Sequence, residues 1–330
     1  LFNNKVNGSI AYYRRTTSDM LMRVQLPASA GITNSGGNAD NNSMWANVGS
    51  MYNQGFEFDI NVTLVKKDFE WNMNYNLTTN MNKVTALDAS VDAKGTGIIN
   101  TRPGAITKKD LALGTYFMAE WAGVDPKNGA PLWYKNDGSG ETTSNYSEAK
   151  QVMTEATSPK LFGGFNTSLT WKNIDLNASF GFSLGGKIYN YSRQEYDSDG
   201  AYTDRNQMKL IDGWSRWEKE GDIATHPAAS YGNKSNSNKA STRYLEDGDY
   251  LKLRSLSIGY NLDLSKYYIQ NMRIYFTAEN VFTLTGFSGI DPEVPAYYDE
   301  TTGTYKSIGT AGANLYPSTR KFMFGINLTF

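Results

Sequence analysis

Three aspartates that could bind a cation lie close together in the sequence. Asp197, Asp199 and Asp204 surround Gly200, and carboxylate oxygens at alternating positions around a glycine turn suit Ca²⁺. The segment lacks the spacing and the final glutamate of an EF-hand loop, so we expect no metal site. No carboxylate pair is singled out by its spacing as the acid and base of a glycosidase.

Other catalytic chemistry is restricted by composition. The chain has no cysteine and one histidine, His226, which excludes thiolate chemistry, disulfides and multi-histidine metal sites. Serine-nucleophile motifs, phosphate-binding loops and dinucleotide fingerprints are absent. With 32 basic and 33 acidic residues and a pI near 6.0, the chain also lacks the charge of a nucleic-acid binder. We expect no enzyme and no cofactor, and a packed or solvated role for His226.

Aromatic side chains are the remaining candidates for ligand binding. Their faces stack on sugar rings or on peptide side chains, although packing between loops is the competing explanation for each one. Trp214 and Trp217 lie three apart in residues 210–219, where the spacing predicts a short helix that they anchor. The candidates outside the clearly alternating segments are Trp121, Trp133, Tyr134, Tyr196, Tyr202, Trp214, Trp217, Tyr297 and Tyr298.

The segments that carry these aromatic residues must be positioned by β-strands, because in much of the rest of the chain apolar and polar residues alternate with a period of two. Residues 56–64 and 69–77 form one such pair around Lys66-Lys67-Asp68, and a second pair, 165–171 and 174–184, flanks Lys172-Asn173. Each pair predicts a β-hairpin with one apolar face.

Further strands are predicted near both ends of the chain. The first contains Val6, Ile10 and Tyr12, and the others cover residues 251–262, 272–282 and 322–330. A change of parity near Arg254-Ser255 predicts a β-bulge. This makes eight clear strands, and a weaker pair, 115–124 and 130–135, around Asp125-Pro126-Lys127-Asn128-Gly129, could make ten.

The connections between these strands favour a membrane barrel. Short gaps after Leu64, Trp171 and Leu262 alternate with long ones of roughly 40, 80, 65 and 40 residues, as in outer-membrane barrels, where turns are short on the periplasmic side and loops long on the outside. The polar faces are mainly Asn, Ser, Thr and Gly, which suits a wet lumen. A soluble β-sandwich remains the alternative. A transmembrane helix is excluded, because no stretch of about 18 apolar residues exists.

The last strand ends the chain with an aromatic residue. Its alternating residues Phe322, Phe324, Ile326, Leu328 and Phe330 predict an assembly signal that the barrel-insertion machinery would recognise by strand addition. The alternative is an ordinary strand that happens to be last. If it ends in the periplasm, the three short turns are periplasmic and the four long connections extracellular.

Several motifs occur in the order of a known family. The chain resembles the C-terminal part of SusC/RagA-like TonB-dependent outer-membrane transporters. The motifs are Asn47-Val48-Gly49 with Asn53-Gln54-Gly55-Phe56-Glu57, Gly123-Val124-Asp125-Pro126 with Gly129-Ala130-Pro131, Phe182-Ser183-Leu184-Gly185-Gly186-Lys187, Leu245-Glu246-Asp247-Gly248-Asp249-Tyr250-Leu251, Glu279-Asn280-Val281-Phe282, Gly289-Ile290-Asp291-Pro292-Glu293 and Tyr316-Pro317-Ser318-Thr319-Arg320.

The resemblance implies that residues 1–330 are the C-terminal segment of a large all-β transmembrane barrel, with about 8–10 antiparallel strands. The N-terminal plug and the other barrel strands would lie upstream, as expected of a chain that starts at Leu1 without a signal peptide. It also implies a SusD-like surface lipoprotein, the TonB system acting through the plug, membrane lipid, and an outer-membrane location in a Gram-negative bacterium. We expect import of oligosaccharides, or of peptides. A surface carbohydrate-binding module and a passive porin-like barrel are the alternatives.

Overall fold

The computed structural model describes residues 5–25, 43–66, 68–89, 91–92, 94–100, 104–264, 269–293, 297–299, 304–306, 310–311 and 318–330. Its strands are β1 Val6–Gln25, β2 Ser43–Lys66, β3 Phe69–Thr79, β4 Met81–Leu87, β5 Ile98–Asn100, β6 Ala105–Thr107, β7 Thr115–Ala119, β8 Trp121–Val124, β9 Pro131–Tyr134, β10 Thr142–Thr143, β11 Gln151–Ala156, β12 Leu161–Trp171, β13 Ile174–Leu184, β14 Lys187–Asn190, β15 Leu245–Asp247, β16 Tyr250–Asp263, β17 Asn271–Thr285, β18 Tyr297–Asp299, β19 Thr304–Lys306, β20 Thr310–Ala311 and β21 Lys321–Thr329. The helices are α1 Tyr191–Tyr196 and the 3₁₀ turns η3 Tyr146–Glu148 and η4 Thr242–Tyr244.

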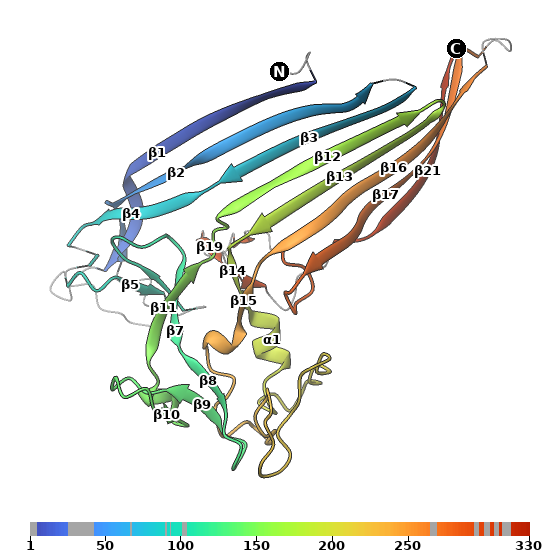
Figure 1. The fold of residues 1–330 in the computed structure, drawn as a ribbon. Coiled ribbons are helices and arrows are strands. Elements are labelled where there is room, and N and C mark those ends of the chain that lie inside the picture. The colour runs from blue at the N-terminus through green and yellow to red at the C-terminus, as the bar shows by residue number, and fades with distance from the viewer. Residues whose placement is uncertain are drawn as a thin grey trace.

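Eight long strands form one curved antiparallel sheet, which we call the wall (Figure 1). Their order is β1-β2-β3-β12-β13-β16-β17-β21, and β4 pairs with the first half of β2. These are the eight strands that the alternation predicts, in a partial barrel. The predicted bulge is confirmed, because the β16–β17 register shifts between Leu253 and Ser255.

The two faces of the wall differ as the alternation requires. Large apolar side chains stand exposed on one face: Ile10 is 72% exposed, Phe56 47% and Phe324 79%. Rings stack across neighbouring strands on this face, with the centroids of Phe165 and Phe180 4.3 Å apart. Such an area of exposed apolar surface marks an interaction with lipid or protein.

Three short connections between neighbouring strands, which we call the tight turns, lie at one end of the wall. They join β2 to β3, β12 to β13 and β16 to β17, and Lys172 takes the left-handed conformation that a two-residue turn needs, with φ 52°. Val6 pairs with Val62, and Thr329 pairs with Asn271. The start of β1 and the end of β21 therefore lie at the same end of the wall as the tight turns (Figure 1).

The predicted pair around Asp125 is not part of the wall. β7 joins a small sheet with β5, β6 and β11, while β8 and β9 form another with β10. These strands of two to six residues are too short to cross a bilayer, which takes about 9–11 residues. The first long connection is also shorter than predicted, because β1 extends to Gln25 and β2 starts at Ser43. The two strands continue beyond their alternating residues because they remain paired with each other as far as Gln25 and Ser43.

The helix predicted at 210–219 is wrong. Gly213 has φ 88° there, and Arg216 makes a parallel bridge with His226 instead of a helical bond. The α-helix in the described residues is α1, whose first turn is capped by Asn190 accepting a hydrogen bond from the Arg193 N–H. No helix within the described ranges is long and apolar enough to span a bilayer.

Two long connections fold together into what we call the loop module, which consists of β5–β11 and of the segment from β14 to β15. Its apolar core joins Tyr116 and Met118 of β7 to Tyr189 of β14 and Tyr244 of η4. The Tyr146 hydroxyl donates to Ala240 O over 2.7 Å, and the Trp121 N–H donates to Thr242 Oγ1 over 2.9 Å. In Figure 1 the loop module lies at the end of the wall opposite the tight turns.

Candidate functional site

The polar face of the wall carries a row of aligned side chains. Asn61 pairs with Asn74, Asn74 with Asn166, Asn166 with Ser179, and Ser179 with Ser255. The Asn74 carboxamide donates to Asn61 Oδ1 over 2.9 Å, and that of Asn166 donates to Asn74 Oδ1 over 3.4 Å. The row continues through Asn7 on one side, and through Glu279 and Lys321 on the other.

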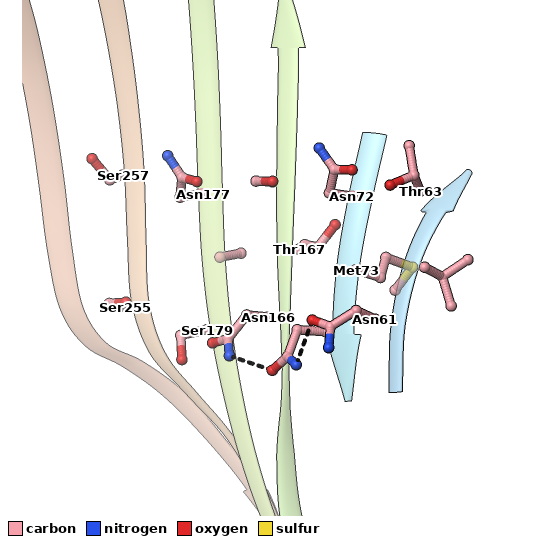
Figure 2. A pocket seen from close by; sticks show the side chains of 14 residues that line it. Asn61, Thr63, Asn72, Met73, Asn166, Thr167, Asn177, Ser179, Ser255 and Ser257 are labelled. Atoms are coloured by element: carbon pink, nitrogen blue, oxygen red, sulfur yellow. Dashed lines mark hydrogen bonds between the residues drawn. The ribbon is translucent and has the colours of Figure 1, made fainter. Parts of the chain in front are cut away.

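A second row runs beside it, one step nearer the tight turns. Its members are Thr63, Asn72, Ser168, Asn177 and Ser257, again in register. Both rows line one hollow of about 400 Å³, seen from close by in Figure 2. We call the part of the two rows on β2, β3, β12, β13 and β16 the neutral belt. Its amides and hydroxyls can donate and accept hydrogen bonds but carry no charge.

Ion pairs flank the neutral belt along the strands. Nearer the tight turns, Arg273 binds Asp175 through Nη2–Oδ2 and Nε–Oδ1 contacts of 2.6 and 3.0 Å. Nearer the loops, the buried Lys252 ammonium lies 3.2 Å from Asp291 Oδ2 and 3.1 Å from Glu293 Oε2. Arg254 Nη2 lies 2.6 Å from Glu293 Oε1. The ion pairs of Lys252 and Arg254 hold the segment after β17, which contains Asp291 and Glu293, against the wall.

A second hollow, the loop pocket, lies in the loop module. Its volume is about 490 Å³, and α1, residues 201–205 and residues 232–240 line it. This volume is within the range of small-molecule sites. Tyr202, one of the predicted ligand-binding residues, lines it and is 39% exposed.

Next to the loop pocket, a buried ion cluster fixes the fold of the loop. Asp197 and Asp199 are buried. Asp199 is bound by Arg216 Nη1 and Arg243 Nη1, each at 2.6 Å, and Asp197 by Arg193 Nε at 3.3 Å. The sequence alone did not predict this cluster, because Arg216 and Arg243 lie far from the aspartates along the chain. The available signal was the i, i+4 spacing of Arg193 and Asp197.

The charge of Asp199 is maintained in spite of its burial. Burial alone would raise the pKa of its carboxyl group, but the charge of Arg243 and hydrogen bonds from Arg243, Ser237 and Arg216 together hold the pKa below its ordinary value. Burial likewise opposes the charge of Arg243, yet Tyr244, Asp199 and Asp197 leave its pKa raised. The Asp199 carboxylate is therefore ionised and already paired with Arg216 and Arg243.

This pairing explains why the aspartates do not suit Ca²⁺. Their oxygens face guanidinium groups, and Asp204 is exposed and lies near Arg205. No cluster of three or more potential metal ligands occurs within the described residues. His226 is fully buried, with Nε2 2.8 Å from Asp197 Oδ2 and Nδ1 2.8 Å from Thr225 Oγ1. Of the two roles expected for it, packed or solvated, it has the packed one.

Four of the predicted aromatic residues make packing contacts. Trp133 is fully buried, and its ring meets Trp121 and Tyr146 edge to face at 5.7 and 5.3 Å. The Arg193 guanidinium lies over the ring of Trp214 at 4.3 Å. The Trp217 N–H donates to Pro126 O over 3.0 Å. Of these contacts, the one between Trp217 and Pro126 joins the two connections of the loop module.

The predicted tyrosines are placed differently. Tyr134 and Tyr202 are exposed, whereas Tyr196 is half-buried at the end of α1. Tyr297 and Tyr298 lie in β18, and their side chains are outside the described part of the chain. The structure therefore brings Tyr202 to a pocket and leaves Tyr134 on the surface.

The residues of the predicted assembly signal lie on and just after β21. Phe322, Phe324, Ile326, Leu328 and Phe330 are all exposed, between 45% and 79%. β21 pairs with β17, and among the described residues it has no partner on its other side.

Known proteins match both the sequence and the fold. The family model described as "TonB dependent receptor-like, beta-barrel" matches residues 1–157. TonB-dependent receptor P3 of Formosa agariphila is 30% identical over 100% of this chain and 33% of its own length. TonB-dependent receptor SusC of Bacteroides thetaiotaomicron is 26% identical over 99% of this chain and 30% of its own length.

Solved structures give the same result. The structure of the RagAB peptide transporter matches with a TM-score of 0.79 and 26% identity, over 99% of this chain and 33% of that one. The RagAB peptide importer in its "closed-closed" state matches with a TM-score of 0.78 and 27% identity, over 100% of this chain and 34% of that one. The chain thus spans about a third of the length of these relatives.

The relatives and the solved structures match nearly the whole chain. The alternation of apolar and polar residues along the wall strands explains why the fold is shared. One face of the wall is apolar and exposed, while the other carries the neutral belt, which is the arrangement of a barrel in the outer membrane. The chain belongs to the SusC/RagA-like TonB-dependent receptors of the outer membrane and corresponds to a C-terminal part of their barrel.

Proposed function

We propose that this chain forms the C-terminal wall and outer loops of an importer that takes up oligosaccharides across the outer membrane. Energy comes from the TonB system through a plug supplied by the rest of the receptor, and a SusD-like lipoprotein closes over the loops. In this arrangement the tight turns are periplasmic and the loop module extracellular. The barrel-insertion machinery recognises β21 through its exposed edge.

The observation that carries this proposal is the neutral belt. Five neighbouring strands present aligned amides and hydroxyls to a hollow of about 400 Å³. Sugar hydroxyl groups both donate and accept hydrogen bonds, and they can exchange partners along such a surface without breaking an ion pair. A charged lining would instead bind or repel charged solutes strongly.

The loop module supplies the second part of the proposal. Exposed aromatic rings capture sugars by stacking at low cost in rotamer entropy. The candidates that remain accessible are Tyr134 and Tyr202, and we assign the first contact with substrate to them. Trp121, Trp133, Trp214 and Trp217 instead make packing contacts within the loop module.

Peptide import is the second candidate, because the similar RagAB structures are named as those of a peptide transporter and importer. Carboxamide side chains also match the hydrogen-bonding groups of a peptide backbone. Uptake experiments separate the two candidates.

The test is uptake by cells that produce the intact receptor, measured with labelled oligosaccharides and labelled peptides in parallel. We expect saturable oligosaccharide uptake that is lost when TonB is deleted. Uptake that persists without TonB indicates a passive porin. A receptor that binds sugars but remains soluble without detergent indicates a surface binding module. Uptake of peptides alone replaces the oligosaccharide assignment with a peptide one.

A further inference from the structure

The loop pocket is open to solvent between two segments of the loop module. Tyr191 and Glu195 of α1 form one side, Tyr202 and Arg205 follow α1, and residues 232–240 form the opposite side. Tyr191 is 47% exposed and Tyr202 is 39% exposed. Two accessible tyrosines, one on α1 and one in the residues that follow it, therefore line one hollow of about 490 Å³.

The rest of the lining is polar and dominated by amides. Gln194, Asn236 and Asn238 line the pocket beside the two rings. Aromatic faces bind the C–H faces of pyranose rings, while amides hydrogen-bond the hydroxyl groups at their edges. A hollow of this size and lining suits a short oligosaccharide better than an apolar ligand.

The charges in the pocket favour an anionic sugar. Glu195 is paired with Arg205, whose guanidinium also lies over the Tyr202 ring at 5.0 Å. Lys239 lines the pocket and is exposed. Among the residues that line the pocket, Glu195 and Arg205 offset each other, so Lys239 gives this lining a net positive charge; Asp204, beside Arg205, lies outside the lining.

The buried ion cluster holds the walls of the pocket in place. Asn233, which lines the pocket, donates to Ser198 O over 2.8 Å and to Ser237 Oγ over 2.9 Å. Ser237 Oγ donates in turn to Asp199, and Gln194 Nε2 donates to Asn238 O over 2.8 Å. A ligand therefore meets a preformed site and does not have to order the loop.

From these contacts we infer that the loop pocket is a subsite for an acidic oligosaccharide unit, with Tyr191 and Tyr202 stacking on the rings and Lys239 binding a sugar carboxylate. The inference rests on the proposed import of oligosaccharides and names the class of sugar. Binding to this pocket precedes transport and needs no energy source.

The test uses the intact receptor that carries this chain, purified in detergent. Binding of digalacturonic acid and of neutral galactobiose is measured by calorimetry. We expect digalacturonic acid to bind more tightly, and Tyr191→Ala and Tyr202→Ala each to weaken its binding about tenfold. Lys239→Gln weakens binding of the acid by about threefold, as for an exposed ion pair, and leaves galactobiose binding unchanged.

Matched controls lie on the same loop. Tyr231, which is 83% exposed, and the exposed Lys234 lie outside the pocket lining, so Tyr231→Ala and Lys234→Gln should bind as the parent does. Equal binding of both sugars, or unchanged binding in the three pocket variants, overturns the inference. Cellular uptake that fails while detergent binding follows the expected pattern counts against the import proposal and not against the subsite.

Discussion

Asp199 is the residue on which the buried ion cluster depends. Its two carboxylate oxygens accept hydrogen bonds from Arg216, Arg243 and Ser237, and its side chain has no exposed surface. Because the Arg243 side chain would remain buried and that of Arg216 half-buried if this charge were removed, loss of the carboxylate costs more than the loss of one hydrogen bond.

We expect Asp199→Asn to destabilise the loop module by about 3 kcal/mol, the cost of leaving a buried charge without its partner. The wall should remain folded, since the cluster lies outside it. Hydrogen exchange in detergent reports both regions at once. Asp204→Asn, at an exposed aspartate, is the control. Equal exchange in the two variants would contradict a structural role for the cluster.

The same carboxylate gives the loop module a dependence on pH. Since its pKa is lowered in the folded protein, the unfolded form binds protons more readily, and the stabilisation is fully present above an unfolded-state pKa of about 3.9. It is lost as the pH falls through the folded value. Limited proteolysis between pH 5 and pH 2 should show cleavage in residues 197–241 before cleavage in the wall as the pH is lowered. Simultaneous cleavage of both regions would argue against this.

At the residue level the sequence identifies chemistry but not partners. It predicts a packed or solvated role for His226, and the burial of this side chain decides in favour of packing. It cannot pair Asp199 with Arg243, because 44 residues separate them and no periodic pattern links one loop to another. For the same reason Trp133 and Tyr134, neighbours in the sequence, could not be separated into a buried ring and an exposed one.

Glycines on the wall make room for side chains from the next strand. A Cβ built on Gly259 would lie 2.6 Å from Arg273 Nε and 2.6 Å from Asp175 Oδ1, so the Arg273–Asp175 pair crosses this strand only because residue 259 has no side chain. Similarly, the Tyr275 ring covers Gly325 of β21, at 2.3 Å from such a Cβ.

We predict that Gly259→Ala displaces the Arg273–Asp175 pair and destabilises the wall by about 2 kcal/mol, as overpacking does. Gly286→Ala is the matched control, because a Cβ there meets no atom within 4 Å. Urea unfolding of the intact receptor in detergent, followed by gel mobility, measures both variants. The same midpoint for the two would rule out the close approach as a source of stability.

The strand β21 allows the two faces of the wall to be compared within one element. Phe324→Arg places a charge on the apolar face and should cost about 3 kcal/mol in the membrane, whereas Asn327→Arg on the opposite face should cost much less. The yield of heat-modifiable barrel in outer membranes measures assembly. If Asn327→Arg assembled worse than Phe324→Arg, our assignment of the faces would be reversed.

The elements of the wall could be predicted from the sequence because burial on one face imposes a period of two on every strand. That period placed eight strands, the tight turns and the bulge near Arg254. It could not place β4, whose seven residues Met81–Leu87 lack a strict alternation and are held by pairing with β2. Nor could it reject a helix at 210–219, where tertiary contacts of Arg216 decide the backbone.

For the whole molecule, the free edges of the wall matter most. Among the described residues, β1 pairs with β2 and β21 with β17, and each leaves its other edge without a partner in the sheet. Long strands with unsatisfied edges cannot remain exposed in a bilayer. We therefore predict that the wall needs further strands to close it.

We predict that residues 1–330 produced alone in liposomes transport neither oligosaccharides nor peptides, and that in detergent they aggregate or associate through these edges. The intact receptor, produced in parallel, should elute as a defined species. Liposome uptake and size-exclusion chromatography are the measurements. A monodisperse, transport-competent chain of 330 residues would show that the wall closes on itself.

The joined connections of the loop module constrain how such receptors can exchange loops during evolution. Trp217 binds Pro126, and Tyr146 binds Ala240, so each connection supplies half of a shared interface. Recombination that replaces one connection with a relative's sequence leaves the other half unmatched. New specificity should therefore spread by exchange of both connections as a unit, or by point substitutions confined to rings and amides that line the pocket.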